Sequence, residues 1–189
     1  MKVLSAEQTR LVEQAAFKIG MSGERLMENA GAAATREINK HYPVNTLNAV
    51  VVVGQGNNGG DGYVVARKLK EYGAKVSVIM AMGIPLTKDS SLMLSRAKQA
   101  QISTLNYYDN VDLCRNLIDS ADIIVDSIFG IGFHGAPDRD VSEIINIVNN
   151  SSAKKVALDL PSGLTADNGE VLGAAIKADL TISFIGYKL

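Results

Sequence analysis

The stretch "VVVVGQGNNGGDGYVVARKL", residues 50–69, decides the fold of this chain. An apolar run of β-branched residues leads into a glycine-rich turn, and the residues after the turn have the apolar spacing of a helix. A buried strand, a tight turn and a helix in this order form the first half of a βαβ unit. The stretch therefore predicts an α/β fold with parallel strands.

The same alternation continues from residue 48 to the end of the chain. The strand candidates are residues 48–54, 75–80, 121–130, 154–161 and 179–186, with a weaker one at residues 101–107. Helical spacing occupies the segments between them, at residues 61–73, 90–100, 110–121 and 139–150. Because the strands are apolar enough to be buried on both faces, we expect a three-layer αβα sandwich, Rossmann-like, around a mostly parallel sheet.

Two helices are expected before this sheet. Ser5 and Gln8 have the spacing of a capping box, and apolar residues follow at helical intervals up to the stop signal Gly20. Residues 22–42 have the pattern of the second helix. The sequence therefore predicts one α/β domain with two N-terminal helices.

Composition excludes several classes of protein. The chain has 189 residues, 47% of them hydrophobic, and a net charge of −1 from 19 basic and 20 acidic residues. This balance gives no basic surface for nucleic acid or an anionic membrane. No apolar run reaches the ~18 residues of a membrane span, and the polar N-terminus is unlike a signal peptide. The single cysteine, Cys114, is expected to be a buried helical thiol, so we expect a soluble, cytoplasmic protein.

Polar residues follow three of the expected strands, in residues 54–62, 125–140 and 158–170. Ligands of open α/β sheets bind beyond the carboxyl ends of the strands. These three segments are therefore predicted to form the functional site. Within the second segment, residues 130–137, "GIGFHGAP", either let the backbone approach a ligand closely or form a merely flexible loop.

The glycine-rich turn raises the question of a dinucleotide. Gly54, Gly56 and Gly59 have the G-x-G-x-x-G spacing of a dinucleotide-binding turn. A dehydrogenase also needs an acidic residue at the end of its second strand, and residues 76–85 contain none. Asp61 would repel a phosphate held against the helix end, so we expect it to cap the helix. These features argue against an ordinary nucleotide-dependent oxidoreductase or methyltransferase.

Two asparagines in the same turn have two readings. Asn57 and Asn58 bring amide groups to the start of the helix, where a plain pyrophosphate turn needs only backbone N–H groups. As an alternative, they are turn residues that tolerate positive φ. Both readings stay open at this point.

Two aspartates should stand at the rim of the sheet, because Asp126 closes the run "DIIVD" and Asp159 closes "VALD". Carboxylates in one cleft can have their pKa values pushed apart, which suits one to acid/base work and the other to holding a cation or hydroxyl. The alternative is that either one caps the following turn. Ser162 is read as a ligand or turn residue, because His41 and His134 lie in a helix end and a glycine loop, away from any Ser-His-Asp pattern.

A hard monovalent cation fits the oxygen atoms of three adjacent strand ends. Asn58 offers an amide oxygen, Asp126 a carboxylate and Ser162 a hydroxyl. A transition metal is not expected, because the sequence has no cluster of Cys and His.

The motifs "GQGNNGGDGYVVAR", "VDSIFGIGFHG" and "LDLPSGL", together with "MENAG" near the N-terminus, resemble the YjeF N-terminal domain family of NAD(P)HX epimerases. The resemblance covers essentially the whole chain. It implies a Rossmann-like αβα sandwich that interconverts the R and S epimers of NADHX and NADPHX, which are hydrated, damaged nicotinamide cofactors. It also implies a functional partner, an NAD(P)HX dehydratase that is either separate or fused at the C-terminus and that repairs the S form.

The resemblance also implies the site residues. Substrate contacts fall on Asn57, Asn58, Gly59, Gly60, Asp61, Gly130, Ile131, Gly132, Phe133, His134, Gly135, Ala136 and Asp159. A potassium ion, K+, falls on Asn58, Asp126 and Ser162. His134 occupies a position that varies in the family, so only contact is expected of it.

Acid/base chemistry at C6 of the hydrated ring follows as a hypothesis. The C6 hydroxyl is next to a nitrogen, so protonation lets it leave as water and gives a stabilised iminium, to which water adds on the other face. Asp159 is expected to be the acid/base, with Asp126 and the potassium ion positioning the substrate. The main alternative hypothesis exchanges the roles of the two aspartates. The alternative function is a non-catalytic ligand-binding or scaffold module of the same fold.

The end of the sequence departs from the family. Members commonly continue past the last strand with a lysine-containing loop and another short strand, whereas this sequence stops at "FIGYKL", in which Lys188 matches the lysine. We therefore expect residues 1–189 to form the family's domain without its extreme C-terminal strand, as a fragment or as the first half of a bifunctional epimerase-dehydratase. The family is often dimeric, and the amphipathic N-terminal helices could pack on a second subunit to give a homodimer.

Overall fold

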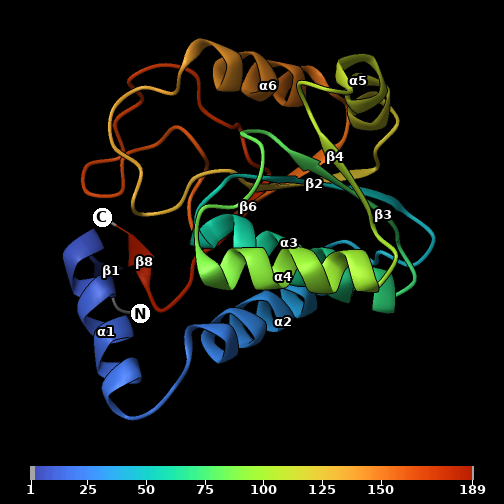
Figure 1. Ribbon diagram of the computed structural model, residues 1–189. Helices are drawn as coiled ribbons and strands as arrows, with labels where there is room; N and C mark the ends of the chain where they lie inside the picture. The colour runs from blue at the N-terminus through green and yellow to red at the C-terminus, as the bar shows by residue number, and fades with distance from the viewer. Residues whose placement is uncertain (1–2, 189) are drawn as a thin grey trace.

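The computed structural model describes residues 3–188 and contains one main sheet. Its strands are β2 (Asn48–Val53), β3 (Lys75–Met80), β4 (Ser103–Asn106), β5 (Ile123–Ser127), β6 (Lys154–Leu158) and β7 (Leu180–Ile182). They lie in the order β4-β3-β2-β5-β6-β7, and every neighbouring pair is parallel. The predicted strands are thus all present (Figure 1).

Helices cover both faces of this sheet. The helices α2 (Gly23–His41), α3 (Asn57–Glu71) and α4 (Lys88–Gln99) lie on one side, and α5 (Val111–Asp119) and α6 (Arg139–Asn150) lie on the other (Figure 1). Each side has its own buried cluster: Val51 and Val53 of β2 belong to the first, and Val50 and Val52 to the second. Successive strand side chains point to opposite faces, which explains why β2 is apolar along its whole length.

Helix α2 forms an outer layer on α3. A Cβ at Gly31 would clash with Val64, so the glycine lets the two helices approach closely. Glu28 of α2 accepts hydrogen bonds from Arg67 of α3 and Arg96 of α4. The close approach at Gly31 and the shared Glu28 carboxylate therefore add to the buried apolar cluster that these three helices share.

The first helix, α1 (Ala6–Lys18), has the predicted capping box. The Gln8 N–H donates to Ser5 Oγ (3.1 Å), and the Ser5 N–H donates to Gln8 Oε1 (2.9 Å). The strand β1 (Val3–Leu4) pairs in parallel with β8 (Tyr187–Lys188), which the sequence did not predict. This pairing brings α1 and the two ends of the described chain together beside the main sheet (Figure 1).

Two expectations about burial and length can be checked directly. Cys114 is a buried free thiol in α5, as predicted. Over residues 3–188, none of the helices combines the length and the apolar composition that a membrane span requires.

The strand order reverses next to β2. The chain runs from β2 outward through β3 to β4 and then returns to β5 on the other side of β2. The loops that follow β2 and β5 therefore diverge, which opens a crevice beyond the carboxyl ends of the strands.

The glycine-rich turn brings α3 against this sheet. A Cβ at Gly59 would clash with the carbonyl oxygen of Gly54, and a Cβ at Gly62 would clash with Ser127 Oγ. At Gly56, in contrast, a Cβ would have no atom within 4 Å, so the backbone there is open to a ligand. The glycines therefore serve close helix-strand packing first, and Gly56 is the one of these three that faces free space.

Candidate active site

A cavity of about 680 Å³ lies beyond the carboxyl ends of β2, β5 and β6. The predicted site residues that line it are Asn57, Asn58, Asp61, Gly130, Ile131, Gly132, Phe133, His134 and Asp159. The structure thus brings residues from all three strand-end segments to one place. The volume lies within the range of about 300–1,000 Å³ that is typical of small-molecule sites.

The remaining predicted site residues do not line the cavity. They are Gly59, Gly60, Gly135, Ala136, Asp126 and Ser162. Gly59 and Gly60 are buried within α3, and Gly135 and Ala136 are on the exposed outer part of their loop. Asp126 and Ser162 are buried and support the residues that do line the cavity, as described below.

The first turn of α3 overturns the prediction for Asp61. Gly56 is the N-cap residue, without a side-chain cap, and the helix begins at Asn57. Asp61 therefore lies in the second turn and does not cap the helix. The prediction was wrong because the helix begins four residues before residue 61, in a turn without apolar side chains.

The same turn decides between the two readings of the asparagines. Asn57 and Asn58 lie in the helix, and neither has a positive φ. This excludes the reading in which they are turn residues with positive φ. The first N–H groups of a helix have no partner within it. Those of α3 are therefore available, with the positive end of the helix dipole, for an anionic group such as a phosphate.

Asn58 links the strand ends to the helix. Its Nδ2 donates to the carbonyl oxygen of Phe129 (2.7 Å) and to that of Leu158 (3.4 Å). Its Oδ1 is buried and has no hydrogen-bond partner among the described residues. A buried acceptor without a donor is costly, so this oxygen fits a site that binds a cation or a ligand hydrogen.

Asp126 and Ser162 form a buried pair below the cavity. The Ser162 hydroxyl donates to Asp126 Oδ1 (2.6 Å), and the Ser162 N–H donates to Asp126 Oδ2 (2.8 Å). The Ile128 N–H also donates to Asp126 Oδ1 (3.2 Å). Burial raises the pKa of Asp126 to about 6, although these hydrogen bonds favour its ionised form.

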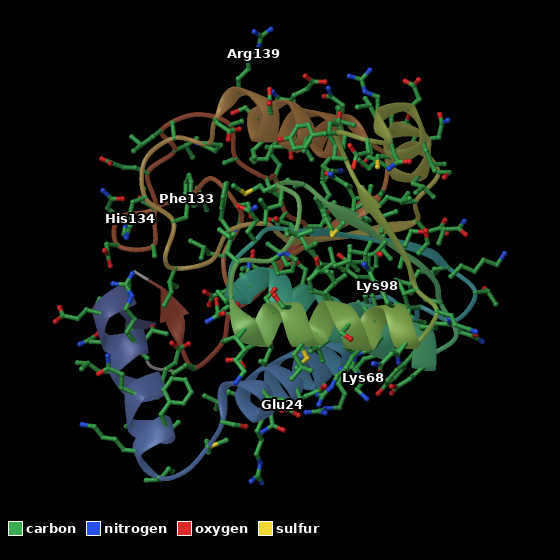
Figure 2. The ribbon with its side chains drawn as sticks, viewed as in Figure 1. Glu24, Lys68, Lys98, Phe133, His134 and Arg139 are labelled. Carbon is green, nitrogen blue, oxygen red and sulfur yellow. The ribbon has the colours of Figure 1, made fainter. Side chains whose placement is uncertain are left out.

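The loop between β5 and α6 forms one wall. The Phe129 N–H donates to Ser162 Oγ (2.9 Å), which anchors the start of the loop to the buried pair. The rings of Phe129 and Phe133 stack, with centroids 4.1 Å apart and planes 18° apart. Figure 2 shows Phe133 and His134 on this loop, on the side of the molecule where α1 lies. Both residues line the cavity, so the loop offers aromatic surface as well as open glycine backbone.

Asp159 directly follows β6 and has a left-handed backbone, with φ of 68°. The conformation is uncommon for a residue other than glycine, and such strain clusters at functional sites. The Ile131 N–H donates to Asp159 Oδ2 (3.3 Å), and the Ser183 hydroxyl donates to the Asp159 carbonyl oxygen (2.9 Å). The carboxyl group is therefore held against the loop wall, at the edge of the cavity.

Asp61 stands on the side of the cavity nearest to α1 and α2. It also lines a smaller cavity of about 210 Å³ that adjoins the first one and is bounded by those two helices. Burial, and then the negative charges of Asp159 and Glu13, raise the pKa of Asp61 well above its ordinary value of 3.8. The Asp61 carboxyl group is accordingly protonated where an ordinary aspartate is ionised.

This protonation gives a testable effect on stability. Asp61→Asn should raise the melting temperature relative to the natural protein, by an amount that grows as the pH rises above 4 and levels off above the raised pKa of the folded Asp61. The unfolded carboxyl group loses its proton near pH 3.8, whereas the folded one keeps it to a higher pH. The folded state therefore binds more protons in this range, and the stability of the natural protein falls as the pH rises. Each kcal/mol corresponds to about 2–4 °C in a chain of this size.

Thermal melts at several pH values check this effect, with Asp112→Asn on the exposed side of α5 as the matched control. The control should show no gain in melting temperature that grows with pH. A melting difference for Asp61→Asn that does not change with pH would contradict the raised pKa.

Several lining residues were not selected as site residues from the sequence. They are Thr9, Arg10 and Glu13 of α1, together with Gln55, Gly56, Met82, Thr87, Ile128, Phe129, Phe184 and Ile185. The residues of α1 were missed because the position of that helix depends on the pairing of β1 with β8, and two-residue strands carry no periodicity. Phe129 was within a recognised motif, but only its neighbours were selected.

Comparison with known proteins identifies relatives of this chain. The family model described as "YjeF-related protein N-terminus" matches residues 23–189. The NAD(P)H-hydrate epimerase of Limosilactobacillus fermentum is 39% identical over 185 residues, which is 97% of this chain and 85% of that protein. The bifunctional NAD(P)H-hydrate repair enzyme Nnr of Escherichia coli is 38% identical over 178 residues, 93% of this chain but only 33% of that enzyme.

A solved structure supports the fold. The crystal structure of yeast ynu0 superposes with a TM-score of 0.90, over 100% of this chain and 82% of the yeast chain. The identity is 23%, so this likeness concerns the fold alone.

Proposed function

The chain belongs to the family of YjeF-related protein N-termini, and from this premise we propose that it is an NAD(P)H-hydrate epimerase, which interconverts the R and S epimers of NADHX and NADPHX in nicotinamide cofactor repair. One observation carries the proposal. The open N-terminus of α3, the aromatic loop after β5 and the Asp159 carboxyl group face one cavity at the point where the strand order reverses.

The phosphates and the damaged ring need different parts of this cavity. The N–H groups at the start of α3 suit a phosphate, with Gly56 leaving room for it. Asp159 lies at the end of β6, beside the loop 130–136. The substrate would therefore extend from the start of α3 to Asp159.

Asp159 is proposed as an acid/base group at C6 of the hydrated ring. It is a rim carboxyl group with a fixed orientation, since the Ile131 N–H holds one of its oxygens. Protonation of the C6 hydroxyl allows it to leave as water, because the neighbouring nitrogen stabilises the resulting iminium. Water then adds again on the other face. Such positioned proton transfer contributes about 10²–10⁴-fold to a rate.

Asp126 is assigned the positioning role that the sequence suggested. It is 1% exposed and does not line the cavity. Its carboxylate accepts hydrogen bonds from the Ser162 hydroxyl and the Ile128 N–H. The Ser162 hydroxyl oxygen in turn accepts a hydrogen bond from the Phe129 N–H. Asp126 therefore fixes the loop after β5, and it also contributes negative charge below the cavity.

Potassium is a proposed part of this site. The buried Asn58 Oδ1, which has no partner among the described residues, the Asp126 carboxylate and the Ser162 hydroxyl are the hard oxygen donors that a monovalent cation takes. These residues fit the ion. When bound, it would supply positive charge that offsets the carboxylate and fixes the start of α3 against β5 and β6.

Potassium binding predicts a cation-specific stabilisation. The melting temperature should be higher in KCl than in choline chloride at equal ionic strength, by about 2.7 kcal/mol of stability when the ion is at 100 times its dissociation constant. Ser162→Ala should reduce this difference, because it removes one ligand. Identical melting temperatures of the natural protein in the two salts would contradict the assignment.

The functional context is proposed from the same family. The chain would work with an NAD(P)HX dehydratase, which is either a separate protein or fused at the C-terminus. The Escherichia coli relative, a bifunctional repair enzyme of which this chain matches one third, supports a fused arrangement. We also infer a homodimer and a cytoplasmic location, where a buried free thiol such as Cys114 stays reduced.

The direct test incubates purified protein, in the presence of KCl, with enriched (R)-NADHX and follows the ratio of epimers by chromatography. The rate should exceed that of the sample without enzyme. An absence of acceleration by a folded protein that binds NADPHX would indicate a binding module instead. Absorbance changes of nicotinamide cofactors with simple alcohols or ketones would indicate an oxidoreductase.

A further inference from the structure

Epimerisation by loss and return of water has a stereochemical requirement. The hydroxyl leaves from one face of the ring, and the new hydroxyl must form on the other face. A proton donor is needed on the first face and a proton acceptor on the second. One carboxyl group on one face returns water to that same face and regenerates the starting epimer.

Two further carboxyl groups line the cavity besides that of Asp159. Among the described residues with carboxyl side chains, those that line it are Glu13, Asp61 and Asp159. Glu13 is on α1, whereas Asp61 and Asp159 extend from the two elements that meet at the sheet edge, α3 and β6. Asp61 is thus the acidic residue that lies in a helix packed on the main sheet and that could exchange protons with the substrate together with Asp159.

The surroundings of the two carboxyl groups place them on different walls. Asp159 Oδ2 accepts a hydrogen bond from the Ile131 N–H, and a Cβ at Gly130 would lie 3.5 Å from the same oxygen, so it belongs to the loop wall. Asp61 also lines the adjoining cavity that α1 and α2 bound, whereas Asp159 does not. A ring that binds between the loop wall and this side of the cavity would present one face to each aspartate.

We propose that Asp61 and Asp159 form a two-carboxyl pair, in which one donates a proton to the departing C6 hydroxyl while the other accepts a proton from the water that adds to the opposite face. This inference rests on the proposed epimerase function. It assigns Asp61 a catalytic role in addition to the substrate contact that the family resemblance implied.

The step is balanced without any further reactant. From one epimer, Asp61 gives its proton to the C6 hydroxyl, the C6–O bond breaks, and the lone pair of N1 forms the N1=C6 double bond. A water molecule then forms a bond to C6 on the other face, N1 recovers its electron pair, and Asp159 takes the proton of the added water. From the other epimer, Asp159 is the donor and Asp61 the acceptor.

The electrostatics of the pair suit this exchange of roles. Burial, and then the negative charges of Asp159 and Glu13, raise the pKa of Asp61. Arg10 and His134 are further ionisable side chains in the cavity lining. The negative charge of Asp159 favours the protonated form of the Asp61 carboxyl group. One donor and one acceptor are therefore present in the same site, as the reaction requires.

Oxygen exchange tests the pair directly. In ¹⁸O-labelled water, the natural enzyme should epimerise each epimer and label both. Asp61→Asn should slow epimerisation by about 100-fold or more. It should still label the epimer whose hydroxyl faces Asp159, less than tenfold more slowly than the natural enzyme, because water can leave and return on that face. Asp159→Asn should show the opposite preference, labelling only the other epimer.

The control is Asp112→Asn, which lies on α5 and outside both cavities, and it should match the natural enzyme. Equal loss of labelling and epimerisation in Asp61→Asn, for both epimers, would overturn the pair and leave Asp61 a structural role. Unchanged epimerisation by that variant would overturn it as well. If the natural enzyme itself accelerates neither process, the epimerase function fails, and the pair fails with it.

Discussion

Asp159→Asn should slow epimerisation by about 10²–10⁴-fold and leave the protein folded. Asparagine keeps the size of the side chain and tolerates the left-handed backbone found at this position, where φ is 68°. Its amide cannot release a proton at the C6 hydroxyl, nor take one from water. The rate constant for approach to the equilibrium epimer ratio, measured at saturating substrate, reports this loss.

The matched control for this variant is Ser183→Ala. The Ser183 hydroxyl donates to the carbonyl oxygen of Asp159, so its removal loosens the backbone while the carboxyl group stays in place. We expect less than a tenfold effect on the rate. Near-natural activity of Asp159→Asn would remove Asp159 from the mechanism and favour the exchanged roles, with Asp126 as the acid/base.

Gly59→Ala should destabilise the domain by about 3 kcal/mol, because its methyl group would clash with the carbonyl oxygen of Gly54. In an open helix the same change gains about 1 kcal/mol from helix propensity. Here the obstacle is backbone at the end of β2, which cannot rotate away as a side chain can. The clash therefore outweighs the propensity, and the melting temperature should fall by about 6–12 °C.

Gly56→Ala, three residues earlier, separates packing from ligand binding. Its φ is −86°, which alanine adopts, and a Cβ there has no atom within 4 Å. Stability should change by less than about 1 kcal/mol, the scale of an N-cap substitution. The methyl group would enter the space that a phosphate needs, so the KM for NADHX should rise. Equal melting temperatures of the two variants would contradict the packing role of Gly59.

Much of the fold was predictable because strands and helices alternate with clear periodicities. The run at Val50–Val53, for example, is apolar on both faces, as is typical of a strand between two helical layers. The start of α3 was placed too late because Asn57 to Gly60 contain no apolar side chain. The pairing of β1 with β8 was not predictable, because it joins distant segments of two residues each.

The candidate site was predictable only where it follows strand ends. The positions of Asn58 and Asp159 follow from the order of parallel strands, since carboxyl ends of such strands meet at one edge. The presence of Arg10 and Glu13 in the cavity lining was not predictable, because it depends on how α1 packs. The raised pKa of Asp61 was also not predictable from the sequence. Its causes, burial and the charges of two neighbouring carboxylates, arise only in the folded chain.

The proposed function requires this cavity to interconvert the two epimers of NADHX. The most direct measurement starts separate reactions from enriched (R)-NADHX and enriched (S)-NADHX, with the same enzyme preparation in KCl, and follows the epimer ratio in each. Both reactions should converge on one ratio with one enzyme-dependent rate constant, which Asp159→Asn should lower by about 10²–10⁴-fold. If the reactions converge no faster than without enzyme, although the protein is folded and binds NADPHX, the epimerase function is contradicted.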